Sequence, residues 1–173
     1  AVTRMVAAKI DGTEMKELIS SRLGDVPSQF NDRVIDWLPD DDEHVLVLVP
    51  GDGGRGIARL NVNTGFLDNQ ELPRPGVSTW ITDGHGAARL YANVSQREVR
   101  WLVRATPDGD WELLHRTEFT DLDDSFTPLG FAESRNELLF FENHEARNAL
   151  FAYDLANNRQ RRLVYAHPTF DVA

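Results

Sequence analysis

A recurring order of segments is the feature that most restricts how this chain of 173 residues can fold. Each copy has an extended stretch that ends in an aromatic residue, then a polar turn, then an apolar run. The aromatic residues are Trp37, Trp80 and Phe131, and they lie 43 and 51 residues apart. Self-similarity at such a period is typical of propellers and solenoids.

Two further extended segments complete each copy, with a tight turn between them. The turns contain Gly65 or Gly109, or follow Asp154, and these residue types suit turn positions. Four short antiparallel strands per repeat is the pattern of a propeller blade. The sequence therefore predicts an all-β fold, a β-propeller fragment of about three to four four-stranded antiparallel blades. The residues that define the predicted blades are Trp37, Trp80, Asp83, Gly86, Phe131, Gly65, Gly109 and Asp154.

The repeat also predicts how the chain is divided. The predicted units are a half blade over 1–22, blades over 32–73, 76–118 and 126–166, and the start of a next blade over 167–173. Because the first residues contain neither an initiator Met nor a signal-peptide pattern, we expect the chain to be a fragment of a longer polypeptide. An incomplete ring would expose the faces of its terminal blades, so we also expect a homodimer of the fragment.

Charge and composition exclude several classes of partner. The chain has 18 Lys and Arg against 28 Asp and Glu, a net charge of −10, and no Cys. Such an excess of carboxylates disfavours binding to nucleic acid or to an anionic membrane surface. The apolar runs are too short to span a bilayer. The composition does not decide between a cytoplasmic and a periplasmic location.

Several motifs resemble ligand sites but are better explained structurally. The glycine-rich segment 51–56 matches a dinucleotide fingerprint, yet a predicted strand follows it instead of a helix. The acidic runs 40–43 and 121–124 lack calcium-loop spacing, and the five His residues form no paired zinc motif. His167 and Asp171 have no nucleophile beside them. We therefore predict no catalytic residue, no metal site and no cofactor. Six aromatic residues are predicted to pack between blades: Trp37, Trp80, Trp101, Trp111, Phe131 and Phe151.

From about Asp32 to its last residue, the chain resembles the N-terminal propeller of prolyl oligopeptidase family serine peptidases, in particular bacterial dipeptidyl and acylaminoacyl peptidase-like members. The stretch 33–47 is similar to an early blade of that propeller. Trp80, Asp83 and Gly86, followed by Arg89, are similar to the opening of the next blade, and segments 128–131, 149–155 and 166–172 continue the resemblance.

In that family the catalytic Ser, Asp and His lie in an α/β-hydrolase domain that follows the propeller. None of the serines of this chain lies in a Gly-x-Ser-x-Gly nucleophile elbow, so the triad is not carried over. The resemblance implies a non-catalytic propeller portion that gates and orients peptides for a hydrolase domain outside this chain. Its expected partners are peptides and that C-terminal hydrolase domain of the parent chain.

Two other functions fit the same repeat. One is a stand-alone propeller that binds a protein or senses a ligand through loops at one end of its blades. The other is a hydrolytic propeller with carboxylates in its central funnel, which rests only on the 28 acidic residues.

Overall fold

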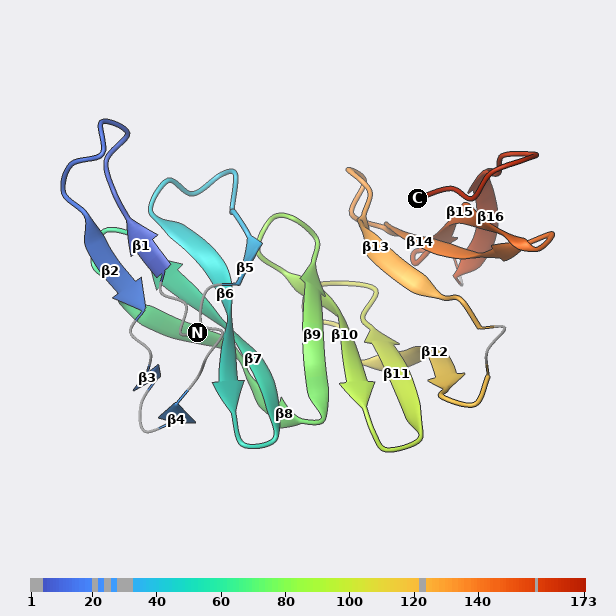
Figure 1. Cartoon of the computed structure of the whole chain (residues 1–173), viewed down its shortest axis with the longest axis horizontal. Helices are drawn as coiled ribbons and strands as arrows, with labels where there is room; N and C mark the ends of the chain where they lie inside the picture. Colours follow the sequence, from blue (N-terminus) through green and yellow to red (C-terminus); the bar gives the residue numbers. More distant parts are fainter. Residues whose placement is uncertain (1–4, 20–21, 24–25, 28–32, 122–123, 158) are drawn as a thin grey trace.

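A computed structural model describes residues 5–19, 22–23, 26–27, 33–121, 124–157 and 159–173, and within these ranges the regular structure consists only of β-strands (Figure 1). The predicted all-β fold class is confirmed. Three four-stranded antiparallel sheets make up most of the molecule, and in each the strand order in space equals the order in the chain.

The sheets follow one another along the sequence. The first sheet contains β5 (Val34–Asp36), β6 (His44–Gly51), β7 (Gly54–Asn61) and β8 (Leu67–Pro75). The second sheet contains β9 (Val77–Thr82), β10 (Ala88–Val94), β11 (Glu98–Val103) and β12 (Glu112–Glu118). The third sheet contains β13 (Thr127–Phe131), β14 (Glu137–His144), β15 (Arg147–Asp154) and β16 (Gln160–Tyr165).

Two short hairpins precede the first sheet. They pair β1 (Met5–Ala7) with β2 (Lys16–Ile19), and β3 (Arg22–Leu23) with β4 (Val26–Pro27). The division of the chain into blades at the limits given above stays a prediction.

The last eight residues, 166–173, form no strand, and the start of a next blade over 167–173 stays a prediction. Asn148 instead donates its backbone N–H to the Asp171 carboxylate at 2.8 Å and accepts the Val172 N–H at 3.0 Å.

Apolar layers between neighbouring sheets form the core. Leu46, Leu48 and Ile57 of the first sheet pack against Trp80 and Tyr91 of the second. The opposite face of the first sheet packs against the β1–β2 hairpin through Ile19, Val45 and Val47. A third layer joins the second and third sheets through Leu90, Val103, Leu138 and Phe140. Because β6 and β10 are covered on both faces, their sequences are apolar without alternation, whereas the burial of β14 alternates.

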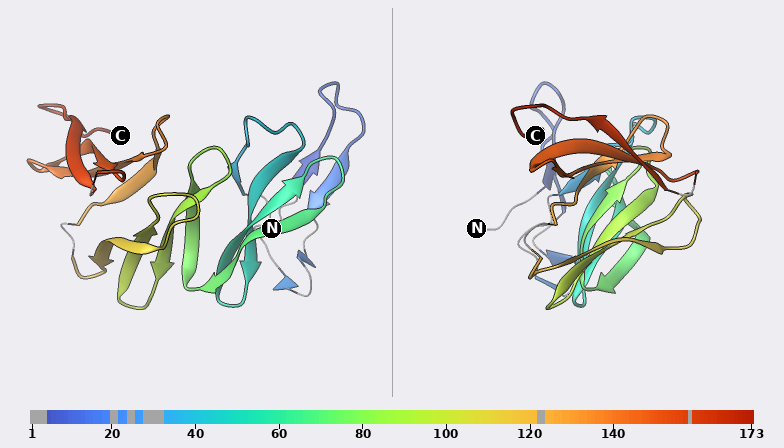
Figure 2. Two further views of the ribbon diagram at one scale, coloured as in Figure 1. Left: turned by 180° about the vertical axis from the view of Figure 1, so that it is seen from behind. Right: turned by 90° about the vertical axis from the view of Figure 1, so that its right-hand side faces the viewer.

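The first strands of the three sheets lie beside one another, β5 against β9 and β9 against β13. Figure 2 shows the same succession of sheets from behind and from one side. In a propeller the first strand of each blade faces the central channel, and this arrangement agrees with that architecture.

Trp37 differs from the expectation that it packs between blades, because its side chain is 75% exposed. Trp80 lies within β9 and is 2% exposed, whereas Trp37 lies just beyond the end of β5. Leu38, whose φ is +49°, takes the buried position in this turn and packs into the layer between the first and second sheets. Matching the two tryptophans by sequence therefore placed Trp37 in the wrong environment.

Candidate functional site

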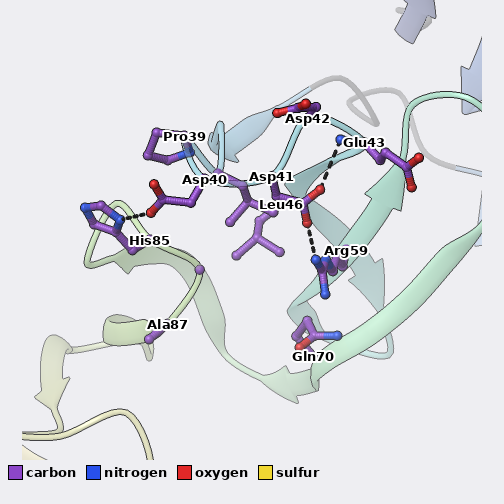
Figure 3. A pocket seen from close by; sticks show the side chains of 12 residues that line it. Pro39, Asp40, Asp41, Asp42, Glu43, Leu46, Arg59, Gln70, His85 and Ala87 are labelled. Carbon is purple, nitrogen blue, oxygen red and sulfur yellow. Dashed lines mark hydrogen bonds and ion pairs between the residues drawn. The ribbon is translucent and has the colours of Figure 1, made fainter.

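A cleft opens between the first and second sheets, at the end of the molecule that carries the β5–β6 and β9–β10 turns (Figure 3). Its volume is about 650 Å³. The β5–β6 turn supplies residues 38–43, the β9–β10 turn supplies residues 85–87, and Leu46, Arg59 and Gln70 come from β6, β7 and β8. Two sheets thus contribute to one site.

The carboxylate of Asp36 holds the two turns together. This side chain lies at the end of β5 and its residue is only 4% exposed. One of its oxygens accepts the Leu38 N–H at 3.0 Å, within the β5–β6 turn, and the other accepts the Gly86 N–H at 2.9 Å, from the β9–β10 turn. A buried acceptor that satisfies two backbone donors fixes the position of both turns.

Gly86 is required by this contact for two reasons. Its φ of +99° lies in the region that favours glycine, and a Cβ at this position would lie 3.1 Å from Leu38 Cδ2. Asp83 completes the same turn, since its Oδ1 accepts the backbone N–H groups of His85 at 3.0 Å and Ala87 at 3.1 Å. The β9–β10 turn is therefore built to approach its neighbour closely.

Two carboxylates at the cleft are paired. Asp40 contacts His85 Nδ1 at 2.9 Å, across the boundary between the sheets (Figure 3). Asp41 bonds to His44 Nδ1 at 2.9 Å, to Arg59, and to the backbone N–H of Glu43 at 3.0 Å. The hydrogen bonds from His44 and then from Arg59 hold the pKa of Asp41 far below its usual range.

The other two carboxylates, Asp42 and Glu43, are exposed, and no side chain in the described part of the protein pairs with them. Beneath them the floor of the cleft contains Leu38 and Leu46, which are 8% and 2% exposed. The cleft therefore combines an apolar floor with a predominantly negative rim. No three His, Asp or Glu residues within the described ranges are arranged to hold a metal ion.

A smaller hollow of about 310 Å³ continues the cleft and shares Gln70, Gly86 and Ala87 with it. At its far side, Glu71 binds Arg74 at 2.9 Å and Arg104 at 3.1 Å. The Arg104 guanidinium lies 4.6 Å from the ring centre of Trp111. These contacts join β8 to the second sheet and hold this side of the hollow in place.

A third hollow, of about 410 Å³, lies where β5, β9 and β13 come together. Phe131 lines it, and the Arg89 guanidinium stands 5.0 Å from the centre of the Phe131 ring. Arg89 itself is 2% exposed and donates to the backbone carbonyls of Arg104 and Ala105. These hydrogen bonds hold the segment that follows β11, so the donors are not directed to a ligand. We call this hollow between β5, β9 and β13 the axial hollow. It is less acidic than the cleft, because Asp83 is its single carboxylate among the described residues.

The predicted blade residues have different positions. Asp83 and Gly86 belong to the turn that forms the cleft, and Trp80 packs behind it, where its Nε1 donates to the Arg55 carbonyl at 2.9 Å. Gly65 and Gly109 lie between strands elsewhere in the molecule. Asp154 ends β15 and accepts the N–H groups of Ala156 and Asn157 in the turn that follows. The structure does not bring the predicted blade residues together into one site.

Sequence reasoning missed Asp36 and the pairing of Asp40 with His85. A usable signal was present, because Asp36 ends β5 and Asp83 directly follows β9, and each accepts the backbone N–H of the residue two positions later. His167 and Asp171 do not form a pair in the structure. His167 stacks on Phe170, with ring centres 5.1 Å apart, and Asp171 binds Asn148.

Comparisons with known proteins identify the fold. No family model and no curated protein matches the chain. Among solved structures, TolB from Acinetobacter baumannii, a β-propeller, matches 96% of the chain with a TM-score of 0.54 and 13% identity. The uncharacterized protein lmo1340 from Listeria monocytogenes EGD-e matches 80% of the chain with a TM-score of 0.49 and 20% identity.

The chain spans only 38% of the TolB chain and 41% of the lmo1340 chain. Together with the three four-stranded sheets, the TolB match assigns the chain as a β-propeller fragment. A likeness at 13% identity extends to the fold and not to the ligand. In the part of the chain that the structure describes, no helix could cross a membrane.

Proposed function

We propose that this propeller fragment is a non-catalytic binding region, and that the cleft between its first and second sheets takes a positively charged peptide segment. One observation carries the proposal: the apolar floor of Leu38 and Leu46 lies beneath a rim on which Asp42 and Glu43 have no side-chain partner among the described residues. A lysine or arginine side chain fits such a surface, because its methylene stem packs on apolar groups while its charged end contacts carboxylates.

Electrostatics favour this ligand class over others. Four carboxylates line the cleft, and only Arg59 and His85 oppose them. An anionic ligand would meet like charge, whereas a cationic peptide would be attracted and oriented. Because the rim is exposed, the attraction should be sensitive to salt.

A lysine-rich peptide and a glutamate-rich peptide of equal length test the proposal by isothermal titration calorimetry. We expect the lysine-rich peptide alone to bind. Asp42→Asn and Glu43→Gln should each weaken it by up to about fivefold, the range for one ion pair at an exposed site. Asp52→Asn is the matched control, since Asp52 is an exposed residue in the β6–β7 turn, outside the cleft.

Three results would contradict the proposal. They are equal binding of both peptides, an equal effect of Asp52→Asn, and an affinity that does not change when the salt concentration is raised.

For the parent protein we propose a prolyl oligopeptidase-like serine peptidase, in which this cleft orients peptides for the hydrolase domain. The support is the ordered resemblance from Asp32 onward, and the propeller fold is consistent with a region that has no catalytic residues of its own.

The full-length parent and the isolated chain should be compared on peptidyl chromogenic substrates. We expect hydrolysis by the parent, blocked by a serine-directed inhibitor, and none by the isolated chain. Serine-dependent turnover by the isolated chain would overturn this assignment. Peptide binding by a parent that hydrolyses nothing would favour the stand-alone interaction module.

A further inference from the structure

The β10–β11 turn lies at the end of the second sheet opposite to the β9–β10 turn (Figure 1). A second charged hollow is formed there by this turn together with β11 and β12. Its volume is about 570 Å³. Three arginines and two glutamates line it together with Ser95 and a glutamine; the charged residues are Arg97, Arg100, Arg116, Glu98 and Glu118. In a chain with a net charge of −10, this hollow has more cationic than anionic side chains.

The β10–β11 turn presents Arg97 on a fixed backbone. Ser95 Oγ accepts the N–H groups of Arg97 at 3.3 Å and Glu98 at 3.2 Å, and the Ser95 N–H donates to the Glu98 carbonyl at 2.9 Å. The Arg97 carbonyl accepts the Phe119 N–H at 2.9 Å. Its side chain, in contrast, is exposed, and no described residue pairs with its guanidinium. The position of Arg97 is thus set by the backbone while its five donors stay available.

Glu98 orients the other two guanidiniums. Its side chain is 8% exposed and binds the Nε atoms of both Arg100 and Arg116, which lie directly opposite each other on β11 and β12. Two like charges at opposed positions repel, and the carboxylate between them offsets that repulsion. Glu98 is the single ion-pair partner of Arg100 among the described residues. One terminal nitrogen of Arg116 binds Glu118 at 3.0 Å.

The arginines of this hollow are therefore not fully neutralised by its glutamates. One glutamate is used internally to hold two arginines, and the exposed Arg97 adds a third cation beside them. Guanidinium groups bind oxyanions through paired N–H donors, and several of them converging favour an anion with more than one charge.

We propose that this hollow is an anion site for a phosphate group, contacted by Arg97 and Arg100 and supported by Arg116. A phosphate dianion has enough acceptor oxygens to use donors from two guanidiniums at once, and a carboxylate offers only two oxygens. The site is separate from the acidic cleft and has the opposite charge preference, so each can fail independently of the other.

Inorganic phosphate is the first probe, titrated into the isotope-labelled chain with amide chemical shifts as the signal and chloride added to hold ionic strength constant. We expect saturable shifts centred on the β10–β11 turn. Arg97→Gln and Arg100→Gln should each weaken the affinity about tenfold, which corresponds to about 1.4 kcal/mol for one charge-assisted contact. Arg33→Gln is the matched control, because Arg33 is an exposed arginine of the axial hollow.

Arg97→Gln is the decisive variant, since the exposed Arg97 guanidinium has no hydrogen-bond or ion-pair partner among the described residues that its loss would break. Thermal unfolding of each variant checks that the fold is kept. O-phosphoserine is the second probe. Binding of either probe at this turn supports the site. Binding of inorganic phosphate alone identifies free phosphate as the ligand, and binding of O-phosphoserine alone identifies an attached phosphate group, whereas binding of both shows that the site takes either. Non-saturable shifts, shifts unchanged in Arg97→Gln, or an equal loss in Arg33→Gln would overturn the proposal.

Discussion

Asp36 is the single residue on which the shape of the cleft most depends. Its two oxygens bind N–H groups from two different sheets, and its residue is 4% exposed. Replacing it by alanine leaves the N–H groups of Leu38 and Gly86 without their acceptor. Each buried N–H left without an acceptor costs about 1 to 3 kcal/mol, so we expect Asp36→Ala to lower the free energy of unfolding by about 2 to 6 kcal/mol.

Urea unfolding of Asp36→Ala and of the exposed Asp52→Ala measures this effect. The control should change the free energy of unfolding by less than about 0.5 kcal/mol, as is usual for surface substitutions. Equal stabilities of the two variants would show that the Asp36 contacts add nothing.

Stability at acid pH also depends on individual carboxyls. His44 and Arg59 lower the pKa of Asp41. Burial alone would raise the pKa of Asp124, but hydrogen bonds from Phe126 N–H, His115 and Thr117 outweigh burial and lower it. A group whose pKa is lower in the folded state stabilises the fold above its unfolded pKa, which is about 3.9 for Asp, and this contribution disappears as pH falls through the folded pKa.

We therefore expect the free energy of unfolding to fall as pH is lowered below about 4, and to fall less steeply in Asp41→Asn and Asp124→Asn. Denaturant unfolding across this pH range measures the slopes. Slopes identical to that of the unmodified chain would mean that these two carboxyls carry no pH-dependent stability.

The apolar layers between sheets are the main stabilising elements. Leu48 is 2% exposed in the middle strand β6, in the layer that joins the first and second sheets. Leu48→Ala should destabilise the chain by about 3 to 5 kcal/mol, because it creates a cavity at that boundary. Leu72→Ala on β8 is the control, since Leu72 is 68% exposed and its truncation leaves no cavity. Thermal unfolding compares the two variants. Similar unfolding midpoints would show that this apolar layer does not stabilise the fold.

Strands and their order could be predicted from the sequence because period and turn chemistry are local signals. The double-sided burial of β6, for example, is visible in the run 45–49. Trp37 was misplaced because a turn of two or three residues decides which side chain faces inward, and no local signal marks the positive φ of Leu38. The pairing of Asp40 with His85, 45 residues away, depends on how two sheets pack and has no pattern in the sequence.

At the scale of the whole molecule, the outward face of the third sheet has no covering layer in the described structure. The register places Leu139, Phe141, Leu150 and Tyr165 on the face opposite to the buried Leu138 and Phe140. Tyr165 is 52% exposed. Exposed apolar faces of this kind favour association, so a second copy of the chain stays our proposal for a partner.

Light scattering over a range of protein concentrations measures this association. We expect a concentration-dependent dimer, and a lower dimer fraction in Phe141→Glu than in Val6→Glu, a control on the β1–β2 hairpin, where Val6 is 49% exposed. A strictly monomeric chain at high concentration would exclude the homodimer.

Each four-stranded sheet consists of strands that are consecutive in the chain, and in the described residues its apolar layers join it to the neighbouring sheet or hairpin. Structures of this kind behave as a row of units, each stabilised by the units beside it. Within the described residues, the first sheet is flanked on both faces, whereas the third sheet packs on one face, against the second. Amide hydrogen exchange should therefore be slowest in β6 and β7 and fastest in β15 and β16, and the molecule should open from its carboxyl-terminal end inward, one sheet at a time.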